Sequence, residues 1–150
     1  ESAVRSQADS ASRYEAAGDT ATARNWDVWI PVLEGYREWR QGHPERMLEV
    51  LESLPLRRQD RDTRWWRGML YLEVERPADA IRMFETFWGL QMWPIAKYHM
   101  GEAYEQMGDL EKARDSYATF LDAWKDADPE LQPWVDKGRE ALARLWPLDQ

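Results

Sequence analysis

The residue types that most often catalyse reactions or bind metals are scarce in this sequence of 150 residues. Its two histidines are His43, in a predicted turn, and His99, inside a predicted helix. Neither belongs to a His-Glu-x-x-His motif or to a comparable metal-ligand spacing. Because there is no cysteine, disulfides and thiolate chemistry are excluded. The sequence therefore predicts no metal, no cofactor, and histidines that are either solvated or packed.

Carboxylates are plentiful, but they have the spacing of a solvated helix face. Glu102 and Glu105, for example, share one side of a predicted helix, which favours a charged surface over acid–base catalysis. The repeated glycines lie in helices or at their ends, so they form no phosphate-binding loop. We therefore predict that the protein is not an enzyme. The 20 basic and 28 acidic residues give a formal charge of −8, which argues against a nucleic-acid partner.

The helices that must position these side chains are clearest in residues 94–124. Pro94 suits the start of a helix, Gly108 suits a left-handed helix end, and Asp109 can cap the helix that follows. Apolar residues recur every three or four positions on each side of this turn. They are Ala96, Met100, Ala103, Tyr104 and Met107 before it, and Leu110, Ala113, Tyr117, Phe120, Leu121 and Trp124 after it. The pattern predicts two antiparallel helices.

A single period of 33 residues relates this helix pair to the preceding chain. It separates Gly35 from Gly68 and Gly68 from Gly101. The same period separates four further pairs: Tyr71 and Tyr104, Ala80 and Ala113, Phe84 and Tyr117, and Asp27 and Asp60. Asp27 and Asp60 are both plausible N-caps. Self-similarity of this kind is typical of stacked helix pairs, because one pair cannot bury its apolar face alone.

Gly-x-x-Tyr at 101–104, Gly108, and Ala-x-x-x-Tyr at 113–117 together resemble a bacterial-type tetratricopeptide repeat. Small residues at Gly101 and Ala113 would let the two helices approach closely. Lys97 departs from the family pattern, which usually has an aromatic residue there. The resemblance implies an all-α fold, a right-handed α-solenoid of about three helix pairs with an N-terminal helix and a C-terminal capping helix.

We expect an N-terminal helix or linker at 1–26, then an array at 27–146. Its repeats would be 27–59, 60–92 and 93–127, followed by a capping helix at 128–146. Residues 1–25 are rich in Ala and Ser, which is compatible with a helix packed on the first repeat or with a frayed linker. In the capping helix, Asp128 and Pro129 would form the start, and the exposed side would carry Lys137, Arg139, Glu140 and Arg144.

The first repeat has two possible registers. Residues 27–41 and 44–54 are its expected helices, with Gly42 and Pro44 at the turn. The motif that begins at Trp29 also resembles the family's opening motif, in a register two to three residues from that of Gly35. The glycine register puts Glu34 and Glu38 at expected core sites, which conflicts with the cost of burying a charge. Pro31 is acceptable only in the first turn of a helix. In the second repeat, Pro77 should open a helix that runs to about residue 88 and closes at Gly89.

By this resemblance, the first helices of successive repeats line a concave groove that binds extended or helical peptides. The residues facing it would be Trp29, Val32, Tyr36 and Trp39; then Asp62, Trp65, Met69 and Leu72; then Ile95, Tyr98, Glu102 and Glu105. Such a groove is aromatic at one end and acidic at the other, and Trp and Tyr are common anchors of interfaces. Basic residues for clamping a chaperone's terminal carboxylate are missing from this set.

These observations favour a protein- or peptide-binding module that scaffolds or senses within a larger protein. The alternative is self-association, in which residues 1–25 or a second copy of the chain fill the groove. No apolar run approaches the roughly 18 residues of a membrane span. We expect a soluble protein, with the cytoplasm as the favoured compartment, and a first residue other than Met favours excision from a longer chain.

Overall fold

The computed structural model describes residues 9, 12–13, 15–18, 20–56 and 59–146, with the backbone alone for 20–27. The chain divides into an N-terminal unit, residues 1–64, and a C-terminal unit, residues 65–150. All regular structure in the described residues is helical, as the sequence predicted. No helix in these residues is long and apolar enough to cross a membrane. The predicted N-terminal helix in residues 1–26 depends mainly on residues outside those described.

The N-terminal unit contains α2, Thr20–Arg40, and α3, Pro44–Ser53, which pack against each other. Gly35 allows this contact, because a Cβ atom there would lie 2.9 Å from Met47 Sδ and 3.3 Å from Val50. The glycine register is therefore the one that the structure adopts. Glu34 is exposed, and the half-exposed Glu38 side chain pairs with Arg37 at 3.0 Å. The expectation that this register would bury both glutamates was wrong, because Val32 and Gly35 occupy the buried positions instead.

Two boundary predictions for α2 were also wrong. The helix begins at Thr20, so Asp27 lies inside it and is not its N-cap. Residues 20–26 contain neither Gly nor Pro, so nothing in them stops a helix from continuing. Pro31 is likewise in the helix interior and not in the first turn, where it removes one backbone donor while the hydrogen-bonded turns on both sides persist.

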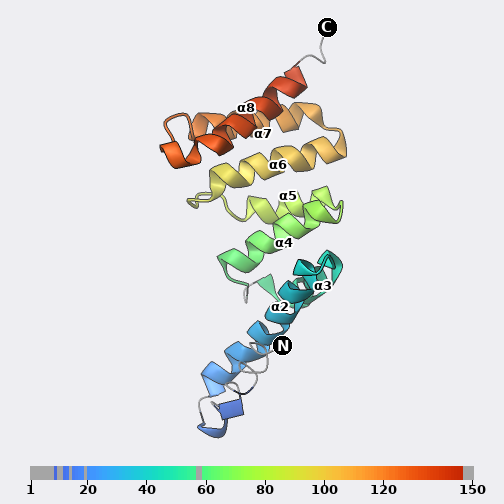
Figure 1. Ribbon diagram of the computed structural model, residues 1–150, viewed down its shortest axis with the longest axis vertical. Helices are drawn as coiled ribbons and strands as arrows, with labels where there is room; N and C mark the ends of the chain where they lie inside the picture. The colour runs from blue at the N-terminus through green and yellow to red at the C-terminus, as the bar shows by residue number, and fades with distance from the viewer. Residues whose placement is uncertain (1–8, 10–11, 14, 19, 57–58, 147–150) are drawn as a thin grey trace. The chain divides into compact units, whose positions relative to one another are not determined.

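Five helices follow, and α4, Arg61–Glu73, spans the boundary between the two units. Asp60 caps it as predicted, since its Oδ1 accepts a hydrogen bond from the Thr63 amide at 2.8 Å. The remaining helices belong to the C-terminal unit: α5, Pro77–Glu85; α6, Trp93–Met107; α7, Leu110–Ala123; and α8, Gln132–Leu145, preceded by the 3₁₀ turn η2, Pro129–Leu131. From α5 onward each α-helix packs against the next as an antiparallel neighbour, the arrangement of a helical-repeat solenoid (Figure 1).

Small residues bring the helices of each pair together, as predicted. A Cβ atom on Gly68 would lie 2.7 Å from the Phe84 ring, and one on Gly101 would lie 2.6 Å from the Tyr117 ring. Ala113 is fully buried. Gly108 has φ +74°, and Asp109 caps α7 by accepting a hydrogen bond from the Lys112 amide at 3.2 Å.

Two helix boundaries differ from expectation in this unit. The helix α5 ends at Glu85 rather than near residue 88, and Gly89 instead belongs to the turns that lead to α6. The predicted start at Pro129 is the 3₁₀ turn η2, so α8 begins only at Gln132. A second proline, Pro133, suits that first turn of α8, because its missing amide donor would have had no helical partner. The four charged residues predicted for its outer side are all exposed.

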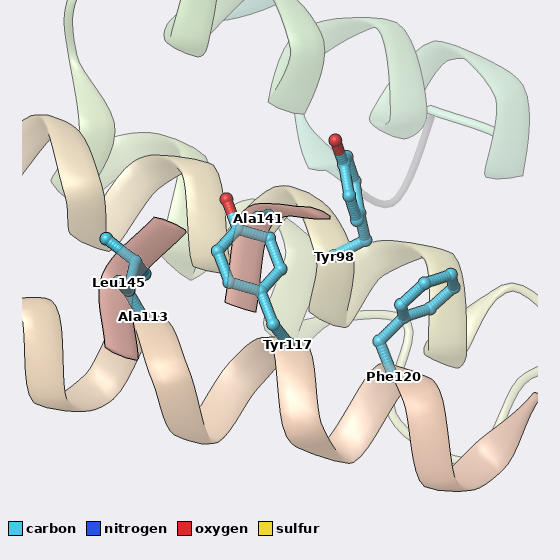
Figure 2. Packing of buried hydrophobic residues seen from close by; sticks show 6 residues of the cluster. All are labelled: Tyr98, Ala113, Tyr117, Phe120, Ala141 and Leu145. Carbon is cyan, nitrogen blue, oxygen red and sulfur yellow. The ribbon is translucent and has the colours of Figure 1, made fainter. Parts of the chain in front are cut away.

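One cluster of buried hydrophobic residues lies between α6, α7 and α8. Its buried residues are Tyr98, Ala113, Tyr117, Phe120, Ala141 and Leu145. Figure 2 shows Tyr117 and Phe120 rising from α7 toward α6, with the Tyr98 hydroxyl pointing away from α7. Gly138 lets α8 join this core, because a Cβ atom there would lie 2.6 Å from the Phe120 ring.

Candidate partner-binding face

The predicted groove residues of the N-terminal unit differ in accessibility. Val32 is 1% exposed and belongs to the core, so it cannot contact a partner in this state. Trp29 and Trp39 are partly buried, and Tyr36 is 38% exposed. The rings of Tyr36 and Trp39 meet edge to face with their centroids 6.0 Å apart. This unit therefore presents a small aromatic surface on α2.

The predicted groove residues at positions 62–105 also divide into two groups. Leu72 and Tyr98 are each 8% exposed, so both are core residues. Ile95 packs against the same core. The side chains that remain accessible are Asp62, Trp65, Met69, Glu102 and, to a smaller extent, Glu105.

Sequence reasoning missed the arrangement around His99, which is packed rather than solvated, with 5% of its surface exposed. Its ring centroid lies 5.4 Å from that of Trp65 on α4 and 5.9 Å from that of Trp134 on α8. It also stacks on Phe84 at 5.6 Å and meets Tyr98 at 5.3 Å. His99 thus fills the space between rings from four helices.

Glu102 brings a charge to the edge of these rings. Its Oε2 lies 2.6 Å from His99 Nδ1, while 39% of its side chain stays exposed. The i,i+3 spacing of His99 and Glu102 was the available sequence signal for this pair. Trp134 had a weaker signal, since the helical spacing of Trp134, Ala141 and Leu145 is compatible with packing but does not indicate contact with α6.

Glu105, one turn further along α6, is committed to contacts within the fold. The Tyr117 hydroxyl donates a hydrogen bond to its Oε1 at 2.6 Å, and Arg144 Nη2 donates to both of its oxygens at 2.8 and 2.9 Å. One carboxylate on α6 therefore ties down side chains from both α7 and α8.

The environment of the two tyrosines makes them poor acids. Burial, and then the nearby Glu102 carboxylate, raise the pKa of Tyr98 from 10.0 to about 12. Burial and the hydrogen bond to Glu105 raise the pKa of Tyr117 well above its usual range. Both phenols therefore stay protonated at neutral pH and act as hydrogen-bond donors rather than nucleophiles.

We call the partly exposed side chains of Trp65, Met69, Glu102 and Trp134 the Glu102 face. Met69 belongs to it because it follows Trp65 by one helical turn on the same side of α4. The face combines apolar rings with one partly exposed carboxylate. Within the described residues, no group of three or more acidic, histidine or cysteine side chains could hold a metal ion.

Residues 96–127, which cover most of α6 and all of α7, match the family model of the tetratricopeptide repeat. No curated protein and no solved structure matches the chain. Tetratricopeptide repeats are generally non-catalytic repeats that mediate contacts between proteins. The match falls on the helix pair whose glycine, tyrosine and alanine spacings are the most regular, and the neighbouring pair α4–α5 has the same close approach at Gly68. Residues 96–127 of the chain are thus similar to a tetratricopeptide repeat.

Proposed function

We propose that this protein is a non-catalytic interaction module that binds a peptide segment of a protein partner on the Glu102 face. The observation that supports this most directly is the set of partly exposed indoles on α4 and α8 around His99 and Glu102 of α6. Partly exposed tryptophans are the commonest energetic anchors of protein interfaces. The aromatic surface of Trp29, Tyr36 and Trp39 on α2 is a second proposed contact region.

A substitution at Met69 tests this proposal without emptying the core. Trp65 is a poor choice, because its ring also packs on Phe84 and Phe87 at 5.4 and 5.5 Å. Met69→Ala removes the methionine side chain from the face without adding a charge, and Met107→Ala removes one that is 51% exposed at the end of α6. Peptides selected by phage display on the full chain should bind Met69→Ala at least about tenfold more weakly, the effect of losing roughly 1.4 kcal/mol, and should bind Met107→Ala as tightly as the parent.

The proposal fails if both variants bind the selected peptides as the parent does. Circular dichroism melts must first show that Met69→Ala is folded, and Met69→Gln, which keeps the length of the side chain, is the second variant if it is not. A scaffolding or sensing role within a larger protein stays a prediction that follows from this binding.

Self-association is the second candidate, and one observation favours it. Trp88 is 74% exposed and Leu90 is 42% exposed in the turn between α5 and α6, and Trp88 meets Trp93 edge to face at 4.9 Å. Exposed apolar side chains of this size are typical of contact sites. If a second copy covers them, light scattering should give the mass of a dimer for the parent and of a monomer for Trp88→Ser.

A further inference from the structure

The carboxylates of Glu102 and Glu105 have different ion-pair partners. Arg144 neutralises Glu105 through contacts with both carboxylate oxygens. The ion-pair partner of Glu102 in the described residues is His99, which is charged only when protonated. Glu102 therefore presents negative charge at the surface while His99 is neutral.

Two cations on the packed helices make other contacts. Lys137 Nζ on α8 lies 4.5 Å from the centroid of the Trp134 ring, and Arg67 on α4 donates a hydrogen bond to Tyr71 Oη at 2.9 Å. The contact between Lys137 and Trp134 also shows that this indole can receive a cation, through attraction to the negative face of its π system. A carboxylate beside partly exposed indoles is the chemistry that recognises an ammonium or guanidinium group.

We infer that the peptide segment bound on the Glu102 face is basic, with a Lys or Arg side chain that pairs with Glu102 and lies against the ring of Trp65 or Trp134. This inference rests on the proposed function and adds the class of partner. The formal charge of −8 acts in the same direction, because it attracts a basic segment and slows the approach of an acidic one.

The test uses a random library of peptides of about twelve residues, displayed on phage and selected on the full chain. Clones whose binding depends on Met69 are then sequenced and synthesised. We expect Lys and Arg to be enriched in them relative to the unselected library. Their affinity should fall when the salt concentration rises from about 50 to about 500 mM, because salt screens exposed charge pairs.

Glu102→Gln removes the charge but keeps a side chain of the same shape that can still bond to His99. It should weaken binding of these peptides about tenfold, as expected for the loss of one charge-assisted contact. Glu111→Gln, at an exposed position in the first turn of α7, is the matched control that changes the net charge equally. It should leave the affinity unchanged.

The possible results separate this inference from the proposed function. Peptides that depend on Met69 but lack basic residues, or that bind Glu102→Gln as tightly as Glu111→Gln, would overturn the inference and leave the proposed function intact. If no selected peptide depends on Met69, the proposed face itself is wrong and the inference fails with it.

Discussion

Glu75 has a left-handed backbone conformation, which costs less at the two equivalent positions of the repeat because both of them are glycine. Gly42, Glu75 and Gly108 are 33 residues apart, and each lies just after the first helix of a pair, with φ of +90°, +55° and +74°. A left-handed residue ends such a helix at no steric cost only when it is glycine. Glu75 therefore carries a local cost of about 1–2 kcal/mol that the other two turns avoid.

Replacing Glu75 with glycine should stabilise the protein. We expect Glu75→Gly to raise the free energy of unfolding by up to about 1 kcal/mol, because the left-handed strain exceeds the extra chain entropy that glycine loses on folding. Glu140→Gly, at an exposed site inside α8, is the matched control and should lower it by about 1 kcal/mol. Urea denaturation of the two variants and the parent checks both signs. If both variants lower the free energy of unfolding by the same amount, Glu75 is not strained.

At the scale of elements, neighbouring helices approach closely where one of the two contacting residues is glycine or alanine. The rings of Phe84 and Tyr117 cover Gly68 and Gly101, and Phe120 covers Gly138. Because interiors are close-packed, none of these contacts has room for a larger group without a shift of the helices. The same argument applies to Ala113, which is fully buried within α7.

Enlarging a buried alanine should therefore cost more than enlarging an exposed one. We expect Ala113→Leu to lower the free energy of unfolding by about 1–3 kcal/mol through overpacking against α6 and α8. Ala143→Leu adds the same atoms at an exposed position of α8 and should stay within about 0.5 kcal/mol of the parent. Overlapping thermal melts of the parent and Ala113→Leu would contradict the packing described.

At the scale of the whole molecule, the free energy of unfolding depends on the protonation of two core tyrosines. The pKa of Tyr98 is raised to about 12, so the folded state keeps this proton at a pH where an unfolded tyrosine, with a pKa of 10.0, has lost it. The stabilisation is complete below about pH 10 and is lost as the pH rises toward about 12. Tyr117, whose pKa is shifted in the same direction, adds to this alkaline sensitivity.

Removing the Tyr98 hydroxyl should make the protein less sensitive to alkali. Urea denaturation followed by tryptophan fluorescence at about pH 9 and about pH 11 should show a smaller loss of stability for Tyr98→Phe than for the parent. Tyr36→Phe, at a ring that is 38% exposed, tests whether loss of any phenol has this effect. Equal pH dependence in the parent and Tyr98→Phe would refute the assigned coupling.

The sequence by itself determined the features that depend on near neighbours in the chain. Helix starts at Pro44 and Pro77, the cap at Asp109 and the left-handed end at Gly108 follow from the local chemistry of proline, aspartate and glycine. The 33-residue spacing then predicted close helix pairs, because small residues at matching positions imply matching contacts. The start of α2 was missed for a local reason as well, since an N-cap residue is also tolerated inside a helix.

Only the tertiary structure decided which of the predicted groove residues are buried and which remain accessible. Leu72 and Tyr98 share the predicted groove spacing with Trp65 and Glu102, yet packing of neighbouring helices covers the first two and leaves the others partly exposed. The approach of Trp134 to His99 likewise joins residues from helices far apart in the chain. Periodicity specifies the side of a helix on which a residue lies, but burial depends on how closely the next helix approaches, and that is set by side chains distant in sequence.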